Sequence, residues 1–327
     1  MSTMQAVFAT AYGGPQVLQV QSVAVPQVKA HEVLIQVHAS GITRADSMMR
    51  SGTPRFARLF LGLSKPKKPI IGTGFAGTIS QVGSAVKNFA VGDQVFGETT
   101  INFGANAEYV AVDARGIVMK LPPNMSYEAG SLMCDGPLTS WNFLHRMAKV
   151  QPGDRVLIIG AGGALGTAAV QIAKYLGAVV TGVCSTSKVE KVASLGADAV
   201  IDYTQRDFTQ EAAQYEVIFD TVAASSFSQC KPVLSVHGQY LCPDVSLSLL
   251  WQGLSSGKGK QAKFGATGLL AEDKLKQMLL ELLKMYADGM LAIPIEREYA
   301  LQEIQEAHAR LETGRKWGNL VLVLNNH

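Results

Sequence analysis

The chain has 327 residues, of which 47% are hydrophobic and 17% are charged, and its formal net charge is +3. This composition excludes an intrinsically disordered protein, and the length exceeds what one small core needs, so two domains are expected. The small net charge gives no basis for binding nucleic acid or membranes. Four scattered cysteines favour a reducing compartment over a disulfide framework: Cys134, Cys184, Cys230 and Cys242.

The first residues of the chain contain no basic segment followed by a long apolar one, so no secretory signal is predicted. No apolar run approaches the roughly 18 residues that span a bilayer. The expected location is therefore the cytoplasm.

Residues 5–120 read as short strands separated by turns rich in glycine and proline. The expected strands are 16–23, 31–39, 77–82, 94–97 and 107–112. Gly83, Gly92 and Gly97 interrupt the later strands, which favours a mostly antiparallel, barrel-like β domain. Pro122 and Pro123 end this region, and Ser126 is predicted to start a helix that leads towards residues 141–147.

An apolar run from Val156 breaks at a glycine cluster, Gly160-Ala-Gly-Gly-Ala-Leu-Gly166, and a helical pattern follows at once. This order predicts a buried strand, a tight turn and a helix start. Glycines let the backbone approach a ligand closely, and a helix N-terminus attracts anions. The cluster alone also fits a purely structural turn. Its context favours binding of a pyrophosphate.

That context is an alternation of short β-rich runs with helical ones over residues 150–245. The runs at 177–184, 196–203 and 217–220 read as further strands, and a helical pattern leads to Leu195. Such alternation is typical of a doubly wound parallel sheet. The segment is therefore predicted to be a Rossmann dinucleotide-binding domain of the α/β class.

The end of the second strand bears on which dinucleotide binds. An NAD site usually has an Asp or Glu there for the ribose 2′-hydroxyl. In this chain the strand ends at Ser185, and the first carboxylate after it is Glu190. Ser185 and Lys188 provide a hydroxyl and an ammonium, which suit a 2′-phosphate. The alternative is that Lys188 is a solvated lysine at a helix start; the pattern favours NADP(H).

Beyond the sheet, residues 253–265 with Lys258, Lys260 and Lys263 are expected to form a flexible basic loop. Apolar residues at 275, 278, 279, 282 and 283 predict a helix over 275–285. A short extended piece at 293–295, a helix over 301–311 and a last strand at 320–324 follow.

These pieces, in this order, resemble the medium-chain dehydrogenase/reductase superfamily over essentially the whole chain. The matching motifs are Gly41-Ile-Thr-Arg-Ala-Asp46, Pro69-Ile-Ile-Gly72, Val91-Gly-Asp-Gln-Val-Phe-Gly97, Leu121-Pro-Pro, Gly136-Pro-Leu-Thr139, Leu195-Gly-Ala-Asp198, Ile201-Asp-Tyr203 and Gly314-Arg-Lys-Trp-Gly-Asn-Leu-Val-Leu322. The resemblance implies a GroES-like catalytic domain at 1–122, a Rossmann domain at 123–265 and a return to the catalytic domain at 266–327.

Zinc alcohol dehydrogenases of this superfamily have a Cys at the position of Thr43 and a His-Glu pair at the positions of Thr73 and Gly74. Their third ligand aligns with Asp135, and Cys134 is one position off. One carboxylate and one thiol do not make a catalytic zinc site, which needs about three side-chain ligands. Residues 90–115 also lack the cysteines of the structural zinc lobe. No metal site is expected.

The zinc-free members that look most similar are the quinone oxidoreductases, including the zeta-crystallin-like group. This similarity implies a homodimeric enzyme that transfers hydride from NADPH to a small-molecule quinone or α,β-unsaturated carbonyl compound. Thr43 is the expected catalytic residue. The implied cofactor-binding residues are Thr43, Thr139, Ala161, Gly162, Gly163, Ala164, Leu165, Ser185, Lys188, Tyr203, Val222 and Lys316.

Several of these residues also have a plain structural interpretation. Thr43 either hydrogen-bonds the nicotinamide ribose and joins a proton relay, or is a turn residue. Asp46 is expected to cap the following helix rather than donate a proton. Tyr203 either approaches the adenosine 2′-phosphate or is a half-buried tyrosine at a strand end. By the same analogy, Lys316 returns to the cofactor.

Two features depart from the simplest expectation. Relatives commonly read Ala-Ser-Gly-Gly-Val-Gly where this chain has Ala161-Gly-Gly-Ala-Leu-Gly166, and an Ala164 at positive φ would cost on the order of 1 kcal/mol. The basic segment 50–68 is either a surface loop with an apolar anchor or a lid over the acceptor site.

Two rival functions follow from the same fold. Basic loops at 55–68 and 258–263 suit the phosphates of an enoyl thioester, which would make the chain an enoyl-thioester reductase. Crystallin-like recruitment would make it a non-catalytic NADPH-binding sensor or structural protein.

Overall fold

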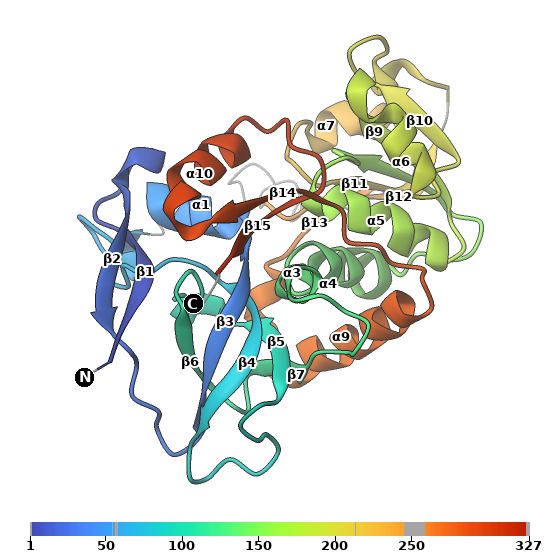
Figure 1. The fold of residues 1–327 in the computed structure, drawn as a ribbon. Helices are drawn as coiled ribbons and strands as arrows, with labels where there is room; N and C mark the ends of the chain where they lie inside the picture. Colours follow the sequence, from blue (N-terminus) through green and yellow to red (C-terminus); the bar gives the residue numbers. More distant parts are fainter. Residues whose placement is uncertain (1, 54, 56–57, 213, 245–258, 325–327) are drawn as a thin grey trace. The chain divides into compact units, whose positions relative to one another are not determined.

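The computed structural model describes residues 2–53, 55, 58–212, 214–244 and 259–324 (Figure 1). The chain divides into two compact units, Met1–Asp135 with Ile295–His327, and Gly136–Pro294. The first unit therefore combines the two ends of the chain, and the second is one continuous stretch. The predicted domain boundaries lay at 122/123 and 265/266.

A seven-stranded sheet forms the body of the first unit, in the order β14-β15-β3-β4-β5-β7 with β6 also paired to β3. All its pairs are antiparallel except β14–β15. Its strands are β3 (Glu32–Ile42), β4 (Gly74–Val82), β5 (Gln94–Glu98), β6 (Tyr109–Asp113), β7 (Ile117–Lys120), β14 (Ile295–Ala300) and β15 (Asn319–Val323). The mostly antiparallel character was predicted from the spacing of the turns.

A separate antiparallel pair, β1 (Thr3–Ala9) with β2 (Leu18–Ala24), completes the strands of this unit. Neither β1 nor β7 was predicted from the sequence. Its α-helices are α1 (Arg44–Ser51), α2 (Arg58–Leu61), α3 (Tyr127–Leu132) and α10 (Ile304–Glu312). The predicted helix start at Ser126 is confirmed, because its side chain accepts the Ala129 N–H at 3.2 Å.

The second unit is built on a six-stranded sheet in the order β10-β9-β8-β11-β12-β13. Its strands are β8 (Arg155–Ile159), β9 (Val179–Cys184), β10 (Ala199–Asp202), β11 (Tyr215–Asp220), β12 (Leu234–Cys242) and β13 (Gln261–Phe264), and every pair is parallel. Counted along the chain, this is the 3-2-1-4-5-6 order of a Rossmann sheet. The predicted doubly wound fold is confirmed.

The second unit also contains the helices that follow, most of them labelled in Figure 1. They are α4 (Gly136–Trp141), a π-helical stretch (Asn142–Ala148), α5 (Ala164–Tyr175), α6 (Val189–Ser194), α7 (Phe227–Cys230) and α9 (Glu272–Ala287). On α9 the buried residues recur at helical spacing, Leu275, Met278, Leu279, Leu282 and Met285, as the apolar period predicted.

Two sequence-based expectations were wrong. Residues Gln261–Phe264 form β13 rather than a loop, and the Lys263 ammonium donates to the Met147 carbonyl at 2.9 Å; residues 253–258 of the expected loop lie outside the described residues. Arg50 belongs to helix α1 and is fully buried, so it is not part of a surface loop or a lid. Ionic and hydrogen-bonding partners within the fold make its burial possible.

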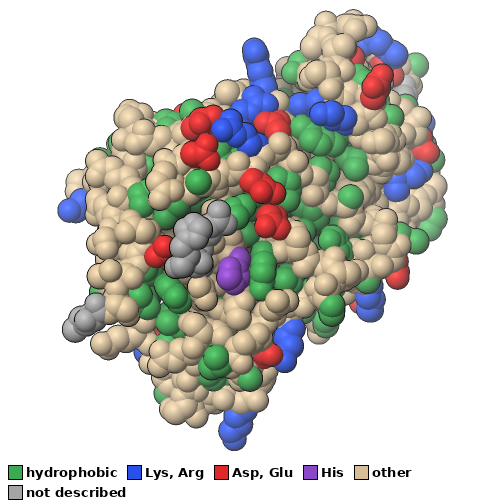
Figure 2. Space-filling model, in the orientation of Figure 1, with side chains coloured by type: hydrophobic (Ala, Val, Ile, Leu, Met, Phe, Trp, Pro, Cys, Tyr) green, Lys and Arg blue, Asp and Glu red, His purple; other side chains and the backbone are tan. Residues whose placement is uncertain are grey.

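Each unit has its own apolar core. The first is centred on β3 and β4 with Val33, Ile35, Phe75 and Ile79, and the second on β8 and β11 with Leu157 and Ile218. All four cysteines are buried and free. No helix in the described part of the chain has the length and apolarity to cross a membrane. On the face drawn in Figure 2, basic and acidic side chains lie in small groups among uncharged ones.

Candidate functional site in two parts

The loop between β8 and α5 has the geometry of an anion cradle. Gly160 adopts φ +77°, and the Gly160 and Ala161 N–H groups both donate to the Val183 carbonyl of β9. Gly163 is the N-cap of α5 and provides no side-chain cap, and the first turn contains no acidic residue. The positive end of α5 is therefore not neutralised by its own side chains, as a phosphate-binding helix requires.

Ala164 does not carry the strain that its place in the glycine cluster suggested. It is the first residue of α5, and it is not among the described residues with positive φ. The positive-φ position of this loop is Gly160, where a glycine is present. The free-energy cost expected for an alanine with positive φ therefore does not apply to Ala164, because a helical φ is ordinary for alanine.

Lys188 lies across this loop. Ser185 is the N-cap of a short 3₁₀ turn after β9, and Lys188 is the last residue of that turn. A Cβ built on Gly162 would lie 2.5 Å from Cδ of Lys188, so the lysine chain runs directly over the Gly162 backbone. The structure thus brings together Ser185, Lys188 and the phosphate loop, three parts of the predicted site.

The end of β10 adds Asp202 and Tyr203. Cys184 of β9 pairs in register with Asp202, and the Tyr203 N–H donates to the Cys184 carbonyl at 3.1 Å. Tyr203 is 60% exposed, which is more than the half-buried alternative assumed. Its backbone is thereby fixed at the strand end while its ring stays accessible to a ligand.

Asp202, within the motif Ile201-Asp-Tyr203 at the end of β10, was not predicted to contact the turn after β9. Its oxygens accept hydrogen bonds from the Thr186 hydroxyl at 2.5 Å, the Thr204 N–H at 2.9 Å and the Gln205 amide at 3.0 Å. The Thr186 hydrogen bond is the main reason why the pKa of Asp202 is lowered. Asp202 therefore links the turn after β9, which contains Lys188, to the turn after β10.

The end of β11 lies against the same loop. The Thr221 hydroxyl donates to the Ile159 carbonyl at 2.8 Å, and a Cβ on Gly160 would come within 2.9 Å of the Val222 methyl groups. Asp220, which is fully buried, fixes this turn by accepting the N–H groups of Val222 and Ala224, each at 3.2 Å. Asp220, which no motif marked, thus places Val222 beside the loop; that Val222 binds the cofactor stays a prediction.

Thr139 lies on α4, which packs against the start of α5. The neighbouring Ser140 hydroxyl donates to the Leu165 carbonyl at 2.9 Å, and a Cβ on Gly136 would meet the Ala164 carbonyl oxygen at 2.6 Å. Helix α4, which contains Thr139, is therefore closely packed on the α5 N-terminus.

Thr43 and Asp46 form a capping box at the start of α1 in the first unit. Thr43 is the N-cap, and its Oγ1 accepts the Asp46 N–H at 3.4 Å. The Asp46 carboxylate accepts the Thr43 N–H at 2.8 Å and the Thr43 hydroxyl at 3.1 Å. The predicted capping role of Asp46 is confirmed, although Thr43 is the N-cap residue itself.

A group of carboxyl side chains shares this region. Burial, with a smaller contribution from the nearby Asp135, raises the pKa of Asp46 to about 7. Burial, with Asp135 and Asp46, raises the pKa of Glu98 to about 8. Burial raises the pKa of Asp135 above its ordinary value, although the Lys316 charge opposes the rise. Asp46 Oδ1 is buried, and no atom of the described residues makes a hydrogen bond of normal geometry to it. An uncharged, protonated Asp46 fits these surroundings better than a carboxylate does.

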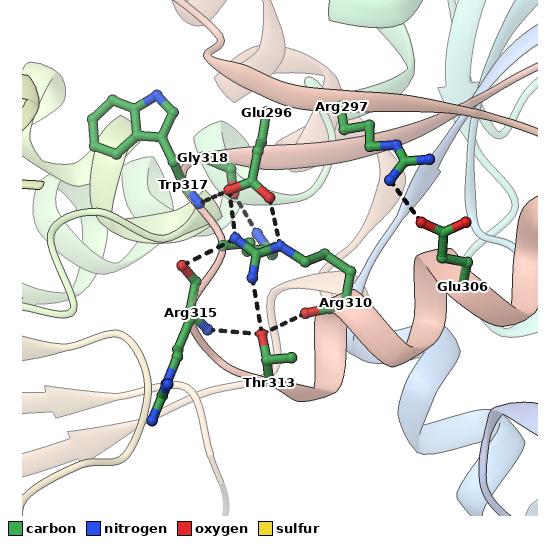
Figure 3. A network of polar contacts seen from close by, with 9 residues as sticks. Glu296, Arg297, Glu306, Arg310, Thr313, Arg315, Trp317 and Gly318 are labelled. Carbon is green, nitrogen blue, oxygen red and sulfur yellow. Dashed lines mark hydrogen bonds and ion pairs between the residues drawn. The ribbon is translucent and has the colours of Figure 1, made fainter. Parts of the chain in front are cut away.

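The segment that contains Lys316 is held by the polar network drawn in Figure 3, where Arg315, Trp317 and Gly318 are labelled. Arg310 of α10 binds Glu296 through two nitrogens, at 2.6 and 3.0 Å, and Glu296 accepts the Trp317 N–H at 2.5 Å. The Lys316 ammonium donates to the Gly318 carbonyl. These contacts fix the segment around Lys316, which places its charge near Asp135 rather than at random in solvent.

Comparison with known proteins agrees with this arrangement. Residues 29–123 match the alcohol dehydrogenase GroES-like domain, 195–322 a zinc-binding dehydrogenase domain, and 143–233 the alanine dehydrogenase/PNT C-terminal domain. Human quinone oxidoreductase is 31% identical over 333 residues, which cover 98% of this chain and 98% of the human protein. The chain belongs to the quinone oxidoreductase family of medium-chain dehydrogenases/reductases.

Two further relatives extend the comparison. The structure of Escherichia coli quinone oxidoreductase in complex with NADPH superposes with a TM-score of 0.84 at 25% identity, over 98% of this chain and all of that one. The chloroplastic NADPH-dependent alkenal/one oxidoreductase of Arabidopsis thaliana is 32% identical over 67% of this chain and 57% of its own length. As a member of this quinone oxidoreductase family, the chain is an oxidoreductase with a GroES-like domain and a Rossmann domain.

The positions that bind zinc in alcohol dehydrogenases make other contacts in this chain. Thr43 caps α1, and the Thr73 carbonyl accepts the Thr99 N–H at 2.8 Å. A Cβ on Gly74 would lie 2.3 Å from the Ser131 carbonyl oxygen, so this backbone has no room for the glutamate of the zinc enzymes. Within the described ranges, no group of three or more His, Cys, Asp or Glu side chains is arranged to hold a metal ion.

Proposed function

We propose that the chain transfers hydride from NADPH to a quinone or an α,β-unsaturated carbonyl compound, and that it does so without zinc. The cofactor is NADP(H). The observation that carries the proposal is Lys188, whose side chain crosses the glycine loop between β8 and α5 of a Rossmann sheet. A cationic side chain at this place suits the extra phosphate that distinguishes NADP(H) from NAD(H).

The phosphate loop passes a direct test of fit. A Cβ on Gly160 would meet Thr221 and Val222, and one on Gly166 would meet the Gly160 carbonyl oxygen at 2.1 Å, so the tight turn requires glycine at both positions; the α5 N-terminus is not capped by a side chain. Its residues Ala161, Gly162, Gly163, Ala164 and Leu165 hold the pyrophosphate. Ser185, Lys188 and Tyr203 surround the adenosine 2′-phosphate, and Thr139 and Val222 line the approach to the nicotinamide. The bound nicotinamide supplies the hydride.

Thr43 is the proposed catalytic residue of the first unit. Its hydroxyl orients the nicotinamide ribose, and it is joined to the Asp46 carboxyl at 3.1 Å. Burial raises the pKa of Asp46 to about 7, so Asp46 can hold a proton near neutral pH. For Thr43 to relay that proton, the hydrogen bond between them reverses: Asp46 donates to the Thr43 hydroxyl while the hydroxyl gives its own proton to the acceptor. Lys316, whose charge acts on Asp135, contributes to cofactor binding from the C-terminal segment.

The side chains at the positions of the zinc ligands support the proposed zinc independence. Two threonine hydroxyls and a glycine replace a thiolate, an imidazole and a carboxylate, and Thr43 is already engaged with Asp46. Without a Lewis acid, the favoured acceptor is one that is already activated for hydride addition, such as a quinone or an enone.

The test is oxidation of NADPH and of NADH, followed by loss of nicotinamide absorbance, with a panel of quinones and enones and with or without a chelator. The proposal expects turnover that prefers NADPH and is indifferent to the chelator. Loss of turnover on chelation would contradict it. Faster turnover of crotonyl thioesters than of quinones would favour the enoyl-thioester reductase, and tight NADPH binding without turnover would favour the sensor.

We further propose that the chain is a homodimer joined through the edge of the Rossmann sheet, where β13 ends the strand order. An edge strand presents backbone groups that can pair with a second copy. Light scattering during size-exclusion chromatography measures the mass directly. A mass near the 34.9 kDa of one chain would contradict the dimer.

A further inference from the structure

Ala223 has an unfavourable backbone conformation at the carboxyl edge of the Rossmann sheet. It lies in the turn 221–225 after β11 and adopts φ +53°, in the left-handed region that favours glycine. Such a conformation persists in an alanine only where the surrounding structure holds it in place, and it is concentrated at functional sites. The neighbours of this turn must therefore hold Ala223 as it is.

One buried carboxyl group holds the backbone of this turn. Asp220 is fully buried, and its Oδ1 accepts the N–H groups of Val222 and Ala224 at 3.2 Å each. Its Oδ2 accepts the Ser225 N–H at 2.8 Å. These hydrogen bonds are made on both sides of Ala223 in the chain, so Asp220 fixes the peptide groups between which Ala223 lies.

Tyr240 of β12 supports the same carboxyl group from the neighbouring strand. Tyr240 is fully buried, and its hydroxyl lies 3.0 Å from Asp220 Oδ2 and 3.1 Å from the Ser225 carbonyl oxygen. Burial, with the Asp220 charge, raises the pKa of Tyr240, so the hydroxyl stays protonated and donates to these acceptors. Tyr240 thereby links Asp220 to the far end of the turn.

The other side of the turn contacts the phosphate loop. The Thr221 hydroxyl donates to the Ile159 carbonyl at 2.8 Å. A Cβ on Gly160 would lie 2.8 Å from the Thr221 hydroxyl oxygen and 2.9 Å from the Val222 methyl carbons. Val222 is 43% exposed, so the turn presents an apolar side chain at the edge where α/β sheets bind their ligands. A change of backbone conformation at Ala223 would move Val222 relative to Gly160.

We propose that Tyr240 is a positioning residue for the cofactor: together with Asp220 it holds the turn 221–225 in its strained form, and so keeps Val222 in place for the nicotinamide half of NADP(H). This inference rests on the proposed function, in which Val222 lines the approach to the nicotinamide. Without the Tyr240 hydroxyl the turn relaxes towards the negative φ that alanine prefers, and the binding-competent form is only partly populated. The apparent dissociation constant then rises by the inverse of that fraction.

The test is the variant Tyr240→Phe, which removes the hydroxyl and keeps the buried ring. Dissociation constants for NADPH, NADH and adenosine 2′,5′-bisphosphate are measured by titration, without any acceptor. NADPH and NADH should each bind about five- to tenfold more weakly, which corresponds to a turn that is correctly formed in that fraction of the molecules. The bisphosphate has no nicotinamide half, so its constant should change by less than about twofold.

Tyr215→Phe is the matched control, because Tyr215 is a buried tyrosine at the opposite end of β11 and its hydroxyl is hydrogen-bonded to Thr181. It should leave all three constants near wild type. Ala223→Gly in the Tyr240→Phe background should restore most of the NADPH affinity, since glycine adopts positive φ about as readily as negative φ. Ala223→Val changes an exposed residue outside the core, and it should weaken NADPH binding as Tyr240→Phe does.

Thermal unfolding of the ligand-free variants is expected to show that each is folded. Unchanged NADPH binding in folded Tyr240→Phe or in Ala223→Val would overturn the inference. Equal weakening of the bisphosphate would do so as well, since it would indicate general damage to the unit, and so would the absence of recovery with Ala223→Gly. A wild-type chain that binds neither NADPH nor NADH would contradict the proposed function instead, so the two failures are distinguishable.

Discussion

The hydroxyl of Thr43 takes part in two hydrogen bonds with one residue. It accepts the Asp46 N–H, which caps α1, and it donates to the Asp46 carboxylate. The first bond stabilises the helix start, and the second is the link that the proposed proton relay needs. Because both bonds share the oxygen, deletion of the hydroxyl removes a structural and a functional contribution together.

Thr43→Ala is therefore expected to lower the free energy of unfolding by about 1 kcal/mol, the usual value of an N-cap. It should also reduce kcat with NADPH by about a hundredfold, as for loss of a proton-transfer group. Thr43→Ser keeps the hydroxyl and should keep both properties near wild type. Denaturant titration and steady-state kinetics measure the two effects; a normal kcat in Thr43→Ala would reduce Thr43 to a helix cap.

At this scale the sequence predicted residues that share a motif and missed those that meet only in space. Ser185 and Lys188 follow one strand, so one local pattern marks both. Asp202 reaches them only through the pairing of β10 with β9, which sets Asp202 opposite Cys184. A search along one strand could not find it, since the register between strands depends on the folded sheet.

Helices α1 and α10 are joined by Arg50, although they lie at opposite ends of the sequence. The guanidinium donates to His308 Nδ1 at 3.3 Å and to the Gly13 carbonyl, and it forms an ion pair with Glu312. Burial, helped by the Arg50 charge, lowers the pKa of His308 to about 3. His308 is therefore neutral at physiological pH and can accept the Arg50 hydrogen bond.

Arg50→Ala should destabilise the chain by about 3 kcal/mol, because it removes a fully buried side chain and leaves polar partners unsatisfied. Glu312→Ala is the matched control. The Glu312 side chain is 43% exposed, so its loss should cost less than about 1 kcal/mol. Chemical denaturation gives both values. Equal costs for the two variants would show that the ion pair, and not the buried guanidinium, joins the helices.

This junction also marks the limit of prediction at the scale of elements. The helices themselves were predictable, since 301–311 shows a helical period. Arg50, however, stands in a run of basic residues that reads as a solvated loop, and two of its partners, His308 and Glu312, are more than 250 residues away in the chain. Likewise, β13 is a four-residue strand within a lysine-rich stretch. Its composition predicts a loop, and it forms a strand because it pairs with β12.

The fold class of each unit could be predicted, because the sequence patterns that indicate it recur along the chain. The alternation of strands and helices predicts the parallel sheet, and closely spaced turns predict the antiparallel one. The cluster of three buried carboxyl side chains, Asp46, Glu98 and Asp135, could not be predicted, because its members come from distant segments of the first unit. Its effect extends to the whole molecule, since it links proton binding to folding.

The sign of this linkage is set by the direction of the pKa changes. Asp46 and Glu98 have folded-state pKa values of about 7 and about 8, above their ordinary values of 3.8 and 4.5. The folded state therefore holds more protons than the unfolded state up to about pH 8, and stability falls as pH rises through this range. His308, with a pKa of about 3, acts in the opposite direction, but only below its ordinary value of 6.5.

Between about pH 6.5 and pH 8 the two acids thus act without opposition from His308. The free energy of unfolding of the wild type should decrease there, with a slope of at most about 1.4 kcal/mol per pH unit for each group. Asp46→Asn and Glu98→Gln should each make the profile flatter. Asp93→Asn is the matched control, because the pKa of Asp93 is lowered by hydrogen bonds and that group has no transition in this range. Denaturant titrations at closely spaced pH values measure the profiles, and a wild-type slope unchanged by both Asp46→Asn and Glu98→Gln would mean that these carboxyl groups are ionised in the folded protein.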